Sequence, residues 1–159
     1  ESDIQLVCNS FVEAKGSMFL GRGCSFPIAL EGALKLKELA YVHAEGYPAG
    51  EMKHGPLALI EEGMPVVVLA PRDSYYKKTI SNMQEVIARG AKVLLITNKS
   101  KDEVYSENIW QTIEVENTSE DLLPFLITVP LQKLAYYSAL KKGYDIDKPR
   151  NLAKSVTVE

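Results

Sequence analysis

The amino-acid sequence predicts an α/β fold, a three-layer sandwich with a mainly parallel sheet flanked by helices and followed by an extended C-terminal tail. Short apolar runs alternate with longer amphipathic stretches along the 159 residues. Two runs in the middle of the chain, VVVLA and VLLI, are almost wholly apolar. Such runs are typical of parallel strands covered on both faces, and their alternation with helices indicates right-handed crossovers.

Four runs are predicted strands, and the stretches beside them are predicted helices. The strands are residues 18–20, 65–70, 92–97 and 112–115. The helices are residues 4–14, 27–42, 73–89 and 121–142. Ser25 is a candidate N-cap with Pro27 in the first turn, and Asp73 or Ser74 can start the third helix. Gly90 and Gly143 lie where a C-terminal glycine is expected.

The chain length fits one domain of residues 1–143 and a tail of residues 144–159, which lacks a sustained period and contains Pro149. Hydrophobic residues make up 46% and charged residues 25%, which indicates a globular domain rather than disorder. The net charge of −3 does not favour nucleic acid or an anionic membrane as a partner, and no apolar run is long enough to span a bilayer.

The cysteines and histidines give little support for metal or disulfide chemistry. Cys8 and Cys24 do not make a disulfide framework, so we expect a cytoplasmic protein. His43 and His54 lie 11 residues apart without paired cysteines, which is not a structural zinc spacing. We therefore expect neither a metal nor a cofactor.

A glycine turn, Gly21-Arg22-Gly23-Cys24-Ser25, lies between a predicted strand and a predicted helix. Backbone N–H groups at a helix N-terminus suit an anion such as a phosphate. The alternative is a tight connection that needs glycine only for its backbone freedom. Because Phe26 occupies the place of a third glycine, the turn is not a dinucleotide fingerprint.

Three charged residues of the next helix, Glu31, Lys35 and Glu38, are spaced i, i+4 and i+7 and form one stripe. Apolar residues such as Leu34 and Leu39 border the stripe, which is unlike a fully solvated face. Partly buried carboxylates of this kind suit proton transfer if apolar neighbours raise their pKa. The alternative is a pair of helix salt bridges, each worth about 0.2–0.5 kcal/mol.

Two further residues are candidates only in a suitable environment. His54 lies in the turn GEMKHGP and could act as an acid or base near neutral pH, or have only a structural role. Lys154 lies in the tail, where a lysine is normally exposed and weakly nucleophilic. A desolvated lysine could instead attack a carbonyl and form a Schiff base.

Together these segments resemble the C-terminal sugar-isomerase (SIS) domain of the glucosamine-6-phosphate synthase family, the isomerizing glutamine–fructose-6-phosphate aminotransferases. The resemblance rests on GRGCSFPIALEGALKLKE, on GEMKHGPLALIEEGMPVVV and above all on the terminal string DKPRNLAKSVTVE. It implies a parallel sheet flanked by helices, in agreement with the alternation above. It also implies conversion of fructose 6-phosphate and glutamine to glucosamine 6-phosphate and glutamate.

The resemblance assigns a role to each candidate residue. Glu38 is similar to the base that moves a proton between C1 and C2 of the sugar, with Lys35 and Glu31 as supporting charges. His54 is similar to a histidine that assists ring opening across a subunit interface, and Lys154 to the lysine that forms the imine. The residues expected to contribute to substrate binding are Glu31, Gly21, Gly23, Ser25 and Ala153.

The sequence also departs from the family pattern. It contains no glutaminase domain with an N-terminal cysteine nucleophile, and no first SIS unit with a serine- and threonine-rich phosphate loop. We therefore expect the second SIS domain of a tandem pair, inactive or partly active alone, whose parent enzyme is a homodimer. The alternatives are a non-catalytic sugar-phosphate-binding module and an inert dimerisation unit.

Overall fold

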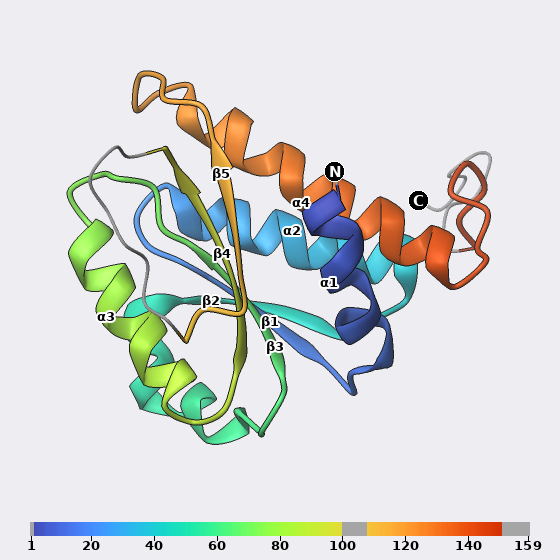
Figure 1. Cartoon of the computed structure of the whole chain (residues 1–159), viewed down its shortest axis with the longest axis horizontal. Coiled ribbons are helices and arrows are strands. Elements are labelled where there is room, and N and C mark those ends of the chain that lie inside the picture. Colours follow the sequence, from blue (N-terminus) through green and yellow to red (C-terminus); the bar gives the residue numbers. More distant parts are fainter. Residues whose placement is uncertain (1, 100–107, 151–159) are drawn as a thin grey trace, which may run out of the picture.

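The computed structural model describes residues 2–99 and 108–150 (Figure 1). A five-stranded sheet forms the centre of the molecule, and its strand order is β2-β1-β3-β4-β5. All four strand pairings are parallel. The strands are β1 Ser17–Gly21, β2 Ala44–Pro48, β3 Pro65–Leu69, β4 Lys92–Asn98 and β5 Gln111–Val115. The predicted parallel sheet is thus confirmed.

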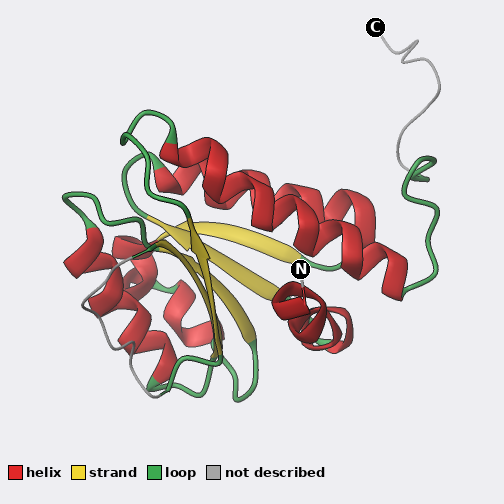
Figure 2. Ribbon diagram, turned by 45° about the horizontal axis from the view of Figure 1, so that its top comes forward, coloured by secondary structure: helices red, strands yellow, loops and turns green. Residues whose placement is uncertain are grey.

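Helices cover both faces of the sheet, which gives the expected three layers (Figure 2). On one face lie α1 (Ser2–Glu13), α2 (Ser25–Ala40) and α4 (Leu123–Lys141). On the other face lie α3 (Tyr76–Ile87) and the short 3₁₀ helices η1 (Ala49–His54) and η2 (Pro56–Leu59). Within the described ranges, no helix combines the length and apolar character needed to cross a membrane.

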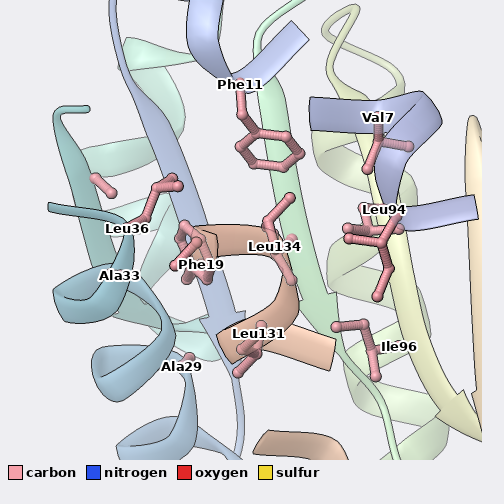
Figure 3. Packing of buried hydrophobic residues seen from close by; sticks show 14 of the residues in the cluster. Val7, Phe11, Phe19, Ala29, Ala33, Leu36, Leu94, Ile96, Leu131 and Leu134 are labelled. Atoms are coloured by element: carbon pink, nitrogen blue, oxygen red, sulfur yellow. The ribbon is translucent and has the colours of Figure 1, made fainter. Parts of the chain in front are cut away.

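Alternation along the central strands divides the core into two clusters. Phe19 and Leu94 face the cluster under α1, α2 and α4, whereas Leu20 and Leu95 face the cluster under α3 and η1. In the first cluster Phe11 of α1 approaches Phe19, and Leu131 of α4 fills the space beside α2 (Figure 3). Truncating a fully buried leucine of this kind to alanine costs about 2–5 kcal/mol.

Close packing of α2 against α4 requires a small residue at Gly32. A Cβ atom there would lie 2.8 Å from Leu131 Cδ1 and 3.0 Å from Phe19 Cδ1. Ala29, Ala33 and Ala40, all fully or almost fully buried, line the same side of the helix. Small residues on this side therefore let α2 approach both the sheet and α4, and its charged stripe is left on the outer side.

Each of the four predicted strands and four predicted helices has a counterpart in the structure, with two differences at the starts of helices. Ser25 is not an N-cap: it is the first residue of α2, and Cys24 takes the cap position without a side-chain hydrogen bond. The third helix begins at Tyr76 rather than at Asp73 or Ser74, and Asp73 Oδ1 accepts the Tyr75 N–H at 2.8 Å in the turn before it. Gly90 and Gly143 have φ values of +88° and +71°, as expected after a helix.

The strand β2 was not predicted. Its sequence AEGYP contains a glycine and a proline and lacks an apolar run, so nothing local indicates a strand. It forms because its backbone pairs with β1 over five positions, from Ser17↔Ala44 to Gly21↔Pro48. The described part of the tail, residues 144–150, contains turns rather than one extended segment.

Candidate functional site

The charged stripe on α2 is a compact ionic group. Lys35 Nζ lies 2.7 Å from Glu38 Oε2 and 3.7 Å from Glu31 Oε1. The side chains of Glu31, Lys35 and Glu38 are 41%, 31% and 29% exposed, so the stripe is partly buried as expected. The hydrogen bond to Glu38 raises the pKa of Lys35, although desolvation acts in the opposite direction. Lys35 is therefore held as an ammonium between two carboxylates.

The leucines beside the charged stripe are more exposed to solvent than the sequence suggested. Leu30 and Leu34 are 44% and 40% exposed, whereas Leu39 is partly buried against the core cluster under α2. Leu34 therefore does not seal the carboxylates from water in this chain by itself. A substrate or another protein surface placed over the stripe would cover these leucines together with the charges.

The C-cap of α2 is Tyr41, which has a left-handed backbone conformation with φ +52° and ψ +40°. Its N–H donates to the Lys37 carbonyl at 3.1 Å and closes the last turn. Its hydroxyl accepts the Arg150 N–H at 2.8 Å, and its ring contacts Tyr144 at a centroid distance of 4.9 Å. The start of the tail is thus held beside the last turn of α2, which carries Glu38. No sequence signal predicted this contact.

The glycine turn lies at the carboxyl end of β1. The chain leaves β1 for β2 on one side, and β3 pairs with β1 on the other, so the carboxyl ends of β1 and β3 flank a topological switch point. A Cβ atom on Gly21 would lie 2.3 Å from the Ser25 carbonyl oxygen, so only glycine fits there. Gly23 has φ +52°, and Ser25 is buried.

A pocket of about 130 Å³ lies beside this turn, with Ser25 and Cys24 on one wall and Tyr75 on another. Asp73 and Glu120 also line it. These two carboxylates oppose an anion, so the pocket does not strengthen the phosphate interpretation of the turn. The close packing at Gly21 gives this glycine a structural role in the turn, and the sugar-phosphate role of the turn stays a prediction.

His54 ends η1 and is 73% exposed. Its Nδ1 lies 2.8 Å from Glu51 Oε2. The turn is fixed by the fully buried Met52, and Lys53 pairs with Glu85 of α3 at 3.0 Å. η1 packs on the face of the sheet opposite to α2, and the described ion pairs and hydrogen bonds join His54 to Glu51 and not to the charged stripe.

A larger pocket of about 380 Å³ lies at the opposite edge of the sheet, where β1, β2 and β3 begin. His43 and Glu45 line it, together with Glu61 and Glu62. None of the candidate residues that the structure describes lines this pocket. Among the described residues, no group of three or more His, Cys, Asp or Glu side chains could hold a metal ion. Ala153 and Lys154 lie outside the described residues.

Comparison with known proteins agrees with this fold and these motifs. The family profile described as "SIS domain" matches residues 10–142. The chain belongs to the SIS-domain family. Over 159 residues it is 54% identical to the glutamine–fructose-6-phosphate aminotransferase (isomerizing) of Bartonella henselae, with all of this chain and 26% of the relative covered. The corresponding protein of Aquifex aeolicus is 52% identical over 157 residues, which cover 99% and 26% of the two chains.

A solved structure is similar to this SIS domain as well. It is the C-terminal domain of glucosamine-fructose-6-phosphate aminotransferase from Francisella tularensis, with a TM-score of 0.85 and 45% sequence identity. The match covers 91% of this chain and 41% of that one. The SIS domain therefore corresponds to the C-terminal part of these proteins, and it spans about a quarter of the length of the curated relatives it matches.

Proposed function

We propose that this SIS domain is the C-terminal isomerase half of an enzyme that converts fructose 6-phosphate and glutamine to glucosamine 6-phosphate and glutamate. The main support is 54% identity over the whole chain to a protein with that name. The charged stripe on α2 also supports it, because the reaction needs a carboxylate base. In this proposal, ammonia and most of the phosphate binding come from parts of the enzyme outside this chain.

In the proposed reaction, Lys154 attacks C2 of the open-chain ketose, and water leaves as the imine forms. Ammonia then replaces Lys154 at C2, which frees the lysine. Glu38 takes a proton from C1 and returns it to C2, while the O1 proton passes to nitrogen. The result is an aldehyde at C1 and an amine at C2. General acid–base catalysis of this kind contributes about 10²–10⁴-fold.

Lys35 and Glu31 support the proton transfer by placing charged groups beside Glu38. The ammonium of Lys35, 2.7 Å from Glu38 Oε2, holds the side chain of the proposed base in one orientation. Glu31 lies 3.7 Å from the same ammonium and keeps Lys35 over the stripe. Glu31, Gly21, Gly23, Ser25 and Ala153 are the residues we propose to contribute to sugar-phosphate binding.

His54 is proposed to open and close the sugar ring in the site of a second subunit. The arrangement of the helices supports this: η1 and α2 lie on opposite faces of the sheet, and no described contact joins His54 to Glu38 of the same chain. Its 73% exposure leaves it available to a partner. This arrangement requires a homodimer of the complete enzyme.

Reductive trapping of fructose 6-phosphate followed by mass mapping tests the proposal. The full-length enzyme should give an adduct confined to Lys154. Plain fructose and Lys154→Ala are the controls, and both should give little adduct. Diffuse labelling of many lysines, or none, would contradict the proposal. The same trap on the 159-residue chain tests whether the isolated domain keeps part of the site.

A further inference from the structure

Tyr41 has a backbone conformation that L-amino acids with a bulky side chain rarely adopt. Its φ is +52°, and no other non-glycine residue of the described chain has a positive φ. In this conformation the Cβ atom crowds the following carbonyl oxygen, so the residue is strained unless tertiary contacts compensate. Gly90 and Gly143, by contrast, end their helices with positive φ and no such strain. A compensating contact is therefore expected at Tyr41.

The structure shows three such contacts, and all of them come from the start of the tail. The Arg150 N–H donates to the Tyr41 hydroxyl at 2.8 Å. The Arg150 guanidinium lies 3.9 Å from the centroid of the Tyr41 ring, and the Tyr144 ring packs edge-on at 4.9 Å. The hydrogen bond joins residues 109 positions apart. Tyr144 itself packs against the core cluster under α2.

These contacts join two segments that lie next to proposed catalytic residues in the sequence. Tyr41 follows Glu38 by three residues, at the end of the same helix. Arg150 precedes Lys154 by four residues. Four residues of chain span at most about 14 Å, so the place where Arg150 is held limits where Lys154 can reach. A loose Arg150 would leave the lysine with a much larger volume to search.

We propose that Tyr41 is a positioning residue for Lys154: it ties the start of the tail to the end of α2 that carries Glu38. This inference rests on the proposed function. The left-handed conformation contributes to this positioning, because it turns Tyr41 away from the helix at the last turn of α2. The aromatic ring and hydroxyl then provide separate contacts to the guanidinium and the backbone of Arg150.

The first experiment measures the tail without any sugar chemistry, in the 159-residue chain. Tyr41→Phe removes only the hydroxyl acceptor, so amide hydrogen exchange at Arg150 should become roughly 2- to 10-fold faster, as expected for the loss of one hydrogen bond. Tyr47→Phe is the matched control, because the Tyr47 hydroxyl donates to Glu45 and not to the described residues of the tail. Equal exchange at Arg150 in the wild type and Tyr41→Phe would overturn the anchor.

Tyr41→Gly separates the anchor from the fold. Glycine adopts the left-handed conformation without strain, so α2 should still end correctly and the Tm should stay close to that of the wild type. All side-chain contacts to Arg150 and Tyr144 are lost, so trypsin should cleave after Arg150 about 10-fold faster or more. An unchanged cleavage rate with an unchanged Tm would contradict the proposal.

The second experiment measures the reactive lysine in the full-length enzyme. Tyr41→Gly should reduce the rate of fructose 6-phosphate trapping at Lys154 by about 10-fold or more, and Tyr41→Phe should reduce it less. A released tail with an unchanged trapping rate would overturn the positioning role. If the wild-type enzyme forms no adduct at all, the proposed function fails and the role of Tyr41 in placing the lysine fails with it. Hydrogen exchange at Arg150 distinguishes the two cases, because it reports the anchor alone.

Discussion

The ammonium of Lys35 lies 2.7 Å from Glu38 Oε2 on the outer side of α2. This contact raises the pKa of Lys35, with the hydrogen bond to Glu38 as its largest cause. Because both side chains are about 30% exposed, we expect solvent to screen the pair and its contribution to stability to be small. Its main consequence concerns the charge state of the stripe rather than the stability of the fold.

The first prediction concerns the pKa of Lys35. Replacing Glu38 with Gln should lower the Lys35 pKa toward its ordinary value of 10.5, because the largest stabilising partner of the ammonium is lost. NMR titration of the Lys35 side chain measures this change. Glu13→Gln, an exposed carboxylate at the end of α1, is the matched control and should leave the titration unchanged.

The same linkage predicts a pH window for stability. The folded pKa of Lys35 lies above the unfolded value, so the stability contribution of the pair is complete below about pH 10 and is lost as the pH rises through the folded pKa. The difference in unfolding free energy between the wild type and Glu38→Gln should therefore shrink above that pH. A difference that grows with pH would show that another group is responsible.

The second prediction tests whether His54 acts across a subunit interface. Two full-length variants, Glu38→Gln and His54→Asn, should each lose most activity. If a site combines Glu38 of one subunit with His54 of its partner, mixed dimers regain one complete site each. An equimolar mixture refolded or co-expressed together should then recover about one quarter of wild-type activity. Recovery close to zero, with mixed dimers demonstrated by mass, would show that both residues act within one chain. A His54→Asn variant that keeps wild-type activity by itself would show that His54 is not required.

The third prediction concerns the glycine turn. A Cβ atom on Gly21 would lie 2.3 Å from the Ser25 carbonyl oxygen, and the obstacle is backbone rather than a flexible side chain. Gly21→Ala should therefore destabilise the chain by about 2 kcal/mol or more. Gly63→Ala is the control: Gly63 has φ +77° but open space around it, so only the smaller cost of the backbone conformation of about 1 kcal/mol applies. Urea denaturation measures both.

The fourth prediction separates the two cysteines. Cys8 is buried and Cys24 is exposed, and burial raises the pKa of the Cys8 thiol. In the native chain an aromatic disulfide reagent should modify Cys24 rapidly and Cys8 on the order of 10³-fold more slowly, because Cys8 reacts only after local or global opening. In the Cys24→Ser variant only the slow modification of Cys8 remains to be measured. Equal rates in the native state would contradict the packing of α1 against α4.

Burial of Cys8 also gives a pH dependence. Its folded pKa exceeds the unfolded value of 9.0, so the neutral thiol is favoured by the fold. The unfolded chain loses this proton first as the pH rises, which lowers stability from about pH 9 up to the folded pKa. Cys8→Ala should abolish this part of the decline, whereas Cys24→Ser should not.

Much of the fold could be predicted from periodicity alone. The apolar runs that became β3 and β4 are buried along almost their whole length, as covered parallel strands require. The stripe of Glu31, Lys35 and Glu38 followed from helical spacing, and the structure confirms that the three charges meet. The edge strand β2 could not be predicted in this way, because its pairing with β1 overrides a sequence with poor strand propensity.

The sequence by itself determined the layers of this protein and the face of α2 that carries the charges, because both follow from the local periodicity of apolar and charged residues. Only the tertiary structure decided that His54 lies on the opposite face of the sheet from Glu38, and that Tyr41 bonds the start of the tail. The hydrogen bond between Tyr41 and Arg150 joins residues 109 positions apart, and a contact at that separation leaves no period or cap in the sequence that could predict it.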